Sequence, residues 1–222
     1  MDRYDFILFD FDDTLWARDI KDIRCSAYNI KFIYKYLFDK SIIISGNSFE
    51  SIKSKLDSIN IVMPAIWAEA NSCFFKNNTY LYSLKECEVQ NSDEIISFIK
   101  NDLKLDYTVL ERDNKIFNIK IKPIYSDRDR IELVDIINHE FKNFNCIARK
   151  TGNTTVDILS ENNSKKLIYN QAGFDIYKTL YIGDEIYEGN DKELANLCTR
   201  KISVKNVYET KALLDCFGRR NI

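Results

Sequence analysis

Short apolar runs alternate with longer amphipathic segments in the first third of the chain. The runs at 6–9 and 42–44 have the length of buried strands, and a third short strand is expected to end near Trp67. Between the strands, apolar positions recur at helical spacing from about 19 to 38, and a second helix is expected at 49–56. Alternation of strands and helices is typical of a parallel α/β sheet.

The pattern changes between residues 77 and 159, where two similar units follow each other. Each unit begins with an amphipathic helix and continues with two strands. The helices are expected near 91–103 and 126–141, and the strands near 107–112, 115–122, 146–150 and 154–159. Phe117, Ile119 and Ile121 alternate with polar residues, which is the period of a half-buried strand. We therefore expect an α+β insert with an antiparallel sheet.

The α/β pattern resumes after the insert. Helices and strands are expected in turn at 164–171, 180–182, 191–198, 202–204 and 209–217. The sequence thus predicts an α/β protein with a doubly wound, Rossmann-like parallel sheet. Residues 1–76 and 160–222 would form this catalytic core, and residues 77–159 the inserted α+β cap.

Composition is consistent with one large domain that carries an insert. The chain has 222 residues, of which 45% are hydrophobic, enough for a sizeable core. It has 32 Lys and Arg against 34 Asp and Glu, so no basic field favours nucleic acid or a membrane surface. Six scattered cysteines argue against a zinc site and a disulfide framework. With neither a signal-peptide pattern nor an apolar stretch of membrane-spanning length, we expect a cytoplasmic protein.

Two carboxylates follow the first predicted strand. Asp10 and Asp12 lie where this strand ends, and Thr14 comes next in the same loop. Because the chain turns there, both carboxylates can converge on one crevice. One carboxylate can attack phosphorus while the other transfers a proton, and the threonine hydroxyl can fix the loop. For this motif by itself, an acidic and solvated turn is the alternative.

Further polar residues lie at the ends of other predicted strands or at the start of a helix. They are Ser45, either Lys165 or Lys166, and Asp184 together with a later acid. In an open parallel sheet these positions face one crevice. Clustered carboxylates need a cation, and oxygen ligands suit Mg²⁺. A serine and a lysine could hold phosphoryl oxygens, so the set has the parts that phosphoryl transfer needs.

In this order, the motifs resemble those of the haloacid dehalogenase superfamily of phosphotransferases. The segment 10–15 is similar to the first motif of that family, with Asp13 where glycine is commoner. Ile44-Ser45-Gly46-Asn47 resembles the second motif, with Asn47 where many relatives have arginine. The segments 164–166 and 181–191 resemble the third and fourth motifs, and Lys165 fits the third better than Lys166.

The resemblance implies a role for each carboxylate. Asp10 would form an aspartyl-phosphate and bind Mg²⁺. Asp12 would protonate the leaving oxygen, then deprotonate water, and its backbone carbonyl would bind the metal. Asp184 would be a direct metal ligand. The further acid is Asp191 or Glu188, because the fourth motif has an unusual spacing here, and we favour Asp191.

The insert lies between the second and third motifs, where its position resembles the larger α+β cap of sugar-phosphate phosphatases and phosphomannomutases. The segment 68–72 resembles the stretch that leads into that cap. Such caps cover the active site and contact the substrate. Arg149 and Lys150, at an expected hairpin, could meet a phosphate or a sugar, and a solvated turn is the alternative. The candidate substrate-binding residues are therefore Thr14, Gly46, Asn47, Arg149 and Lys150.

The sequence predicts a Mg²⁺-dependent hydrolase of a small phosphorylated metabolite, with a sugar phosphate as the favoured substrate. A phosphomutase of the phosphomannomutase type is the alternative that the same resemblance offers. The insert has no excess of positive charge for a second phosphate, which favours hydrolysis. A phospho-accepting, receiver-like domain is an alternative of another class, but it would lack the insert and leave Asp12 without a role.

Overall fold

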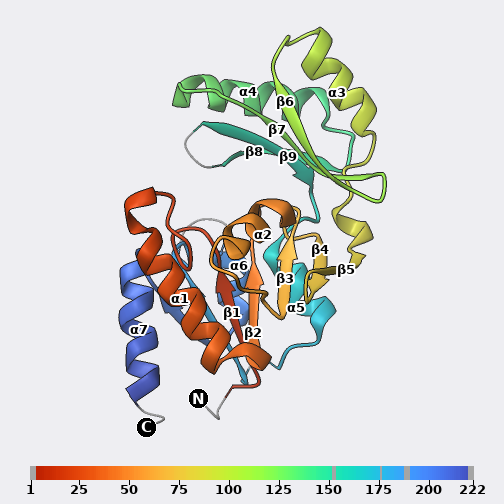
Figure 1. The fold of residues 1–222 in the computed structure, drawn as a ribbon. Coiled ribbons are helices and arrows are strands. Elements are labelled where there is room, and N and C mark those ends of the chain that lie inside the picture. Colours follow the sequence, from red (N-terminus) through yellow and green to blue (C-terminus); the bar gives the residue numbers. More distant parts are fainter. Residues whose placement is uncertain (1–3, 152–153, 176, 188–190, 220–222) are drawn as a thin grey trace. The chain divides into compact units, whose positions relative to one another are not determined.

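A seven-stranded sheet lies at the centre of the part of the chain that holds both termini (Figure 1). The computed structural model describes residues 4–151, 154–175, 177–187 and 191–219. The chain divides into two units, and we describe each by itself. The core unit comprises Met1–Tyr82 and Ser164–Ile222, and the insert comprises Ser83–Asn163.

The core sheet has the strand order β11-β10-β1-β2-β3-β4-β5. Its strands are β1 (Phe6–Asp10), β2 (Ser41–Ile44), β3 (Ala65–Ala68), β4 (Cys73–Lys76), β5 (Thr79–Ser83), β10 (Thr179–Gly183) and β11 (Arg200–Ser203). The pairs from β11 to β3 are parallel, and β4 is antiparallel to β3. β2 and β10 are buried along their whole length, as expected for central strands covered on both faces.

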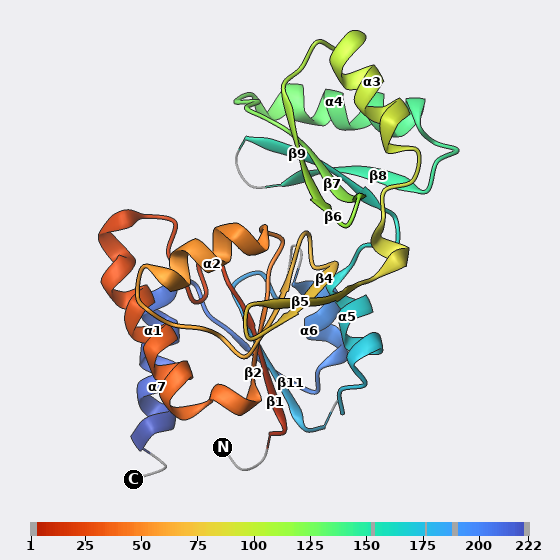
Figure 2. The same ribbon diagram turned by 45° about the vertical axis from the view of Figure 1, so that its right-hand side comes forward.

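Helices cover the core sheet on both faces. They are α1 (Ile23–Tyr36), α2 (Phe49–Asp57), α5 (Lys165–Ala172), α6 (Lys192–Leu197) and α7 (Val207–Arg219). Figure 2 shows α1 and α7 together on one side of the sheet and α5 and α6 on the other. Short 3₁₀ turns occur at Ile20–Asp22, Phe38–Lys40 and Lys85–Cys87. The expected doubly wound α/β core is confirmed.

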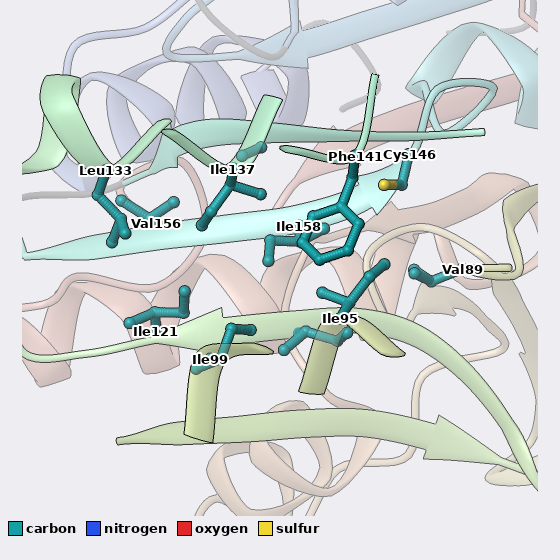
Figure 3. Packing of buried hydrophobic residues seen from close by; sticks show 12 residues of the cluster. Val89, Ile95, Ile99, Ile121, Leu133, Ile137, Phe141, Cys146, Val156 and Ile158 are labelled. Carbon is teal, nitrogen blue, oxygen red and sulfur yellow. The ribbon is translucent and has the colours of Figure 1, made fainter. Parts of the chain in front are cut away.

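The insert has two helices and a four-stranded antiparallel sheet of order β6-β7-β9-β8. Its elements are α3 (Ser92–Asn101), β6 (Tyr107–Arg112), β7 (Lys115–Ile121), α4 (Asp127–Glu140), β8 (Cys146–Thr151) and β9 (Thr155–Ser160). Alternate strand residues and one face of each helix form a separate hydrophobic core, drawn in Figure 3. The two expected helix-strand-strand units are therefore confirmed.

The boundary of the insert lies later than the sequence pattern indicates. Residues 79–82, which we assigned to the insert, belong to β5 of the core sheet. The segment 68–72, expected to lead into the insert, instead turns the chain from β3 into β4. Glu69, Ala70 and Asn71 have φ angles of 50°, 56° and 65°, and the Ser72 N–H donates to Ala68 O at 2.8 Å. A tight left-handed turn therefore keeps this segment inside the core unit.

In the residues that the structure describes, no helix combines the length and apolar character needed to cross a membrane.

Two consecutive isoleucines on α4 offer a direct test of the insert's core. Ile137 is completely buried, whereas Ile136 is 41% exposed. Ile137→Ala should lower the free energy of unfolding of the insert by about 2–5 kcal/mol, because it removes buried methyl groups and leaves a cavity. Ile136→Ala changes the same helix in the same way and should shift stability by only about 0.5 kcal/mol. Hydrogen exchange of the insert's amides, measured as urea is added, gives the free energy of unfolding of each variant. Equal losses of stability in the two variants would contradict the packing described.

Candidate active site

The end of β1 brings the first candidate residue to the edge of the core sheet. Ile7, Leu8 and Phe9 are fully buried, and the strand ends at Asp10. β2 lies in parallel on one side of β1 and β10 on the other, so their carboxyl ends meet at the same edge. The residues that follow these two strands, Ser45 and Asp184, therefore lie at the same edge of the sheet as Asp10.

The loop after Asp10 is closed by its own backbone. The N–H groups of Leu15 and Trp16 donate to Phe11 O at 2.9 and 2.8 Å. Asp13 has a φ angle of 55°, a left-handed conformation that favours glycine and that aspartate tolerates. The expectation that the Thr14 hydroxyl fixes the loop is wrong, since this buried oxygen has no hydrogen-bond partner in the part of the chain described. Hydrogen bonds between backbone groups close the loop instead.

Lys165 is the lysine that reaches the aspartates. Its Nζ lies 2.6 Å from Asp10 Oδ1 and also forms an ion pair with Asp191 Oδ1. Helix α5 begins at Lys165 because the Ser164 side chain accepts a hydrogen bond from the Lys166 N–H at 3.0 Å and caps the helix. Lys165 is 2% exposed, while Lys166 projects into solvent. Of the two lysines, Lys165 is therefore the one that the structure places beside the aspartates.

Three carboxylates converge around this ammonium group. Asp10, Asp184 and Asp191 each offer an oxygen, and these oxygens lie within 4.8 Å of one another. Burial raises the pKa of Asp10 to about 8 against the lowering effect of Lys165, and the Asp191 charge adds to the rise. Burial, followed by the Asp191 charge, raises the pKa of Asp184 to about 6. Burial lowers the pKa of Lys165, but the charges of Asp10 and Asp191 outweigh burial, so the pKa of Lys165 is raised.

The composition of this cluster fits a divalent cation. Three carboxylates face a single buried ammonium group, so the cluster has negative charge to offset. Asp191 is fully buried, and its Oδ2 forms no hydrogen bond of acceptable geometry within the described residues. Carboxylate oxygens are the ligands that Mg²⁺ prefers. Glu188, the alternative acid, lies outside the described residues.

Gly183 lets Asp191 approach the strand. A Cβ atom built on Gly183 would overlap Asp191 Oδ2 and lie 3.1 Å from the Tyr181 hydroxyl. Tyr181 is fully buried, and burial followed by the Asp191 charge raises its pKa well above the usual value. The glycine before Asp184 is therefore a requirement of packing, and Tyr181 is a neighbour of the cluster that the sequence did not single out.

Asp12 lies outside the carboxylate cluster and has its own partners. Asn47 Nδ2 donates to Asp12 Oδ2 at 2.5 Å, and Lys55 Nζ lies 3.3 Å from Oδ1. Asn47 is held in turn, because its N–H donates to Ser45 Oγ at 3.1 Å. Ser45 is 1% exposed, and a Cβ on Gly46 would have no atom within 4 Å. Lys55 was missed, since a lysine on an amphipathic helix carries no signal of its own.

The basic pair expected to contact substrate divides between the two faces of the insert's sheet. Arg149 and Lys150 are neighbours on β8, so their side chains point to opposite faces. Lys150 Nζ lies 3.0 Å from Asp127 Oδ1 on α4, whereas Arg149 is exposed and is opposite Asp157 of β9. Arg149 therefore remains a candidate for substrate contact, whereas Lys150 pairs with a carboxylate on α4.

Comparison with known proteins identifies the fold. No protein-family model and no curated protein matches the sequence. Among solved structures, a haloacid dehalogenase-like hydrolase from Bacteroides thetaiotaomicron is similar with a TM-score of 0.68 and 10% identity, covering 96% of this chain and 99% of the other. One from B. subtilis gives a TM-score of 0.65 and 10% identity, over 94% and 92% of the two chains.

A structure with bound nucleotide is also similar. An IMP-bound mutant of the IMP-nucleotidase of Plasmodium falciparum gives a TM-score of 0.59 and 17% identity, covering 97% of this chain and 68% of the other. These similarities confirm the expected haloacid dehalogenase-like fold with an inserted unit. At these identities they establish the fold and leave the chemistry to be argued from the residues.

Gly183 provides a test of how the carboxylates are arranged. Gly183→Ala should displace Asp191 and weaken Mn²⁺ binding by about 10–100-fold, the usual cost of disturbing a group that orients metal ligands. Gly46→Ala, a matched glycine with open space around its Cα, should leave Mn²⁺ affinity close to that of the wild type. Electron paramagnetic resonance of free Mn²⁺ gives both affinities. Undiminished binding by Gly183→Ala would contradict the placement of Asp191.

Lys165 and Lys166 form a second matched pair. Lys165→Met removes the ammonium group between two buried carboxylates and should lower the free energy of unfolding by about 3–5 kcal/mol. Lys166→Met alters an exposed side chain and should change it by about 0.5 kcal/mol or less. Urea denaturation in EDTA at pH 8 compares them. If both variants were as stable as the wild type, Lys165 would not be the group that holds the cluster together.

Proposed function

We propose that this protein is a Mg²⁺-dependent hydrolase of small phosphate monoesters. The observation that carries the proposal is the convergence of Asp10, Lys165, Asp184 and Asp191 at one edge of the sheet. A further carboxylate, Asp12, lies in the same loop as Asp10 and is free of that cluster. The haloacid dehalogenase-like fold supports the proposal.

Asp10 is the nucleophile of the proposed reaction. A carboxylate oxygen of Asp10 attacks the phosphorus atom, and the bond from phosphorus to the ester oxygen breaks. Asp12 gives a proton to the departing oxygen, which leaves as an alcohol. Asp12 then takes a proton from water as the water attacks the phosphorus of the aspartyl-phosphate, and Asp10 is regenerated with release of phosphate. Protons and bonds balance over the two steps.

The other residues position and neutralise the reacting groups. Lys165 orients Asp10 through the 2.6 Å ion pair and can contact a phosphoryl oxygen once substrate is bound. Asp10, Asp184 and Asp191, with the Asp12 backbone carbonyl, would hold Mg²⁺, which supplies positive charge for the transferring phosphoryl group. Ser45 is proposed to donate its hydroxyl to a phosphoryl oxygen.

A small phosphorylated metabolite is the proposed substrate, and sugar phosphates are its first candidate class. Arg149 is a candidate contact for the substrate because its side chain is exposed on the insert. The structure of the Plasmodium falciparum nucleotidase contains bound IMP, so nucleoside monophosphates belong in the same screen. A phosphomutase would instead convert one hexose phosphate isomer into another with little phosphate released.

Phosphate release is the test of this function. Purified protein should hydrolyse at least one sugar phosphate or nucleoside monophosphate, lose activity in EDTA and recover it with Mg²⁺. Asp10→Asn should lower kcat by more than about 10³-fold, as expected for loss of a nucleophile. Asp13→Asn makes the same change in the same loop and should keep most of the activity, because the Asp13 carboxylate pairs with Arg18 and is not part of the carboxylate cluster. Substantial turnover by Asp10→Asn would refute the assignment.

A further inference from the structure

The carboxylate of Asp12 is held by two donors, one on each oxygen. Asn47 Nδ2 lies 2.5 Å from Oδ2, and Lys55 Nζ lies 3.3 Å from Oδ1. The Asp12 and Lys55 side chains are 27% and 29% exposed, so both remain accessible from solvent. A carboxylate has about four lone-pair directions, and the described residues engage two of those of Asp12, which leaves room for a proton or a reacting group.

The positions of both donors are fixed by the core unit. Asn47 O accepts a hydrogen bond from the Glu69 N–H at 2.9 Å, and the N–H of Phe49 donates to Glu69 Oε1 at 3.2 Å. These bonds tie the loop after β2 and the start of α2 to the β3–β4 turn. On α2, Ile52 and Leu56 are buried on the face next to Lys55. The stem of Lys55 therefore starts from an anchored turn of helix.

A second contact places the ammonium group of Lys55. Nζ lies 5.0 Å from the centre of the Phe11 ring, and Phe11 is fully buried beside Asp12 in the chain. An ammonium group over an aromatic face is attracted by the ring. Lys55 is thus directed to Asp12 by the ring and by the carboxylate together. An exposed ion pair by itself contributes little, because ordering two long side chains costs entropy.

We propose that Lys55, together with Asn47, is a positioning residue for proton transfer by Asp12. This inference rests on the proposed function, in which Asp12 protonates the leaving oxygen. By fixing the rotation of the carboxylate, the two donors keep one free lone-pair direction aimed at the leaving oxygen. Lys55 acts through Asp12 and does not touch the phosphoryl group.

The dependence of rate on the leaving group distinguishes this role from others. An alkyl phosphate needs a proton on its leaving oxygen, whereas 4-nitrophenolate departs without one. The value of kcat/KM reports the steps up to departure of the leaving group. Lys55→Met should therefore lower kcat/KM for an alkyl or sugar phosphate by about 10²-fold, the lower range for loss of general acid catalysis. For 4-nitrophenyl phosphate it should stay near the wild-type value.

Three further variants sharpen the test. Lys53→Met alters a lysine of the same helix that pairs with Asp57, and it should behave like the wild type with both substrates. Lys55→Arg should restore part of the lost rate with the alkyl phosphate. In an Asp12→Ala background, Lys55→Met should cause no further loss, because both substitutions then remove the same step.

The outcomes separate this inference from the proposed function. Equal losses with both substrates would show that Lys55 contacts the phosphoryl group and would overturn the positioning role. If Lys55→Met left kcat/KM unchanged with both substrates, the contact would be a surface ion pair without effect on the reaction, and the positioning role would also be overturned. Wild-type protein inactive toward every phosphate ester would refute the proposed function, and this inference with it.

Discussion

The buried ion pairs of Lys165 with Asp10 and Asp191 are the interaction on which the candidate site depends. Transfer of one ammonium group and two carboxylates from water is costly, and it is tolerable only when the groups satisfy one another. Burial and mutual repulsion still raise the pKa of Asp10 and of Asp184, so the balance of charge is incomplete. That residual negative charge is what makes the cluster suited to a divalent cation.

The parallel sheet explains why residues distant in sequence meet at this point. β1 lies between β2 and β10, and the three strands end at one edge, where Asp10, Ser45 and Asp184 follow them. Lys165 is added from the first turn of α5, after the insert. The insert has a hydrophobic core of its own, so its packing is separate from that of the sheet that carries this edge.

Apolar periodicity predicted most of the helices and strands, and it placed Asp10 at the end of the first strand. It predicted β1 from a short apolar run, and the later motifs in their order, rather than this run by itself, singled out Asp10 as a candidate. It misplaced residues 79–82, since a strand at the edge of a sheet has the same alternation in either unit. It also missed Lys55, whose contact with Asp12 depends on how α2 packs against the loop. Such contacts between elements are set by tertiary packing, which a linear pattern does not contain.

The proposed reaction requires that Asp10 form a covalent bond to phosphorus during turnover. The direct measurement is an acid quench in the steady state, borohydride reduction of any acyl phosphate, and mass spectrometry of the peptides. The account predicts that Asp10 alone is reduced to homoserine, and only when substrate and Mg²⁺ are both present. Reduction at Asp12 or Asp184, or turnover with no reduced aspartate at any point of the time course, would contradict it.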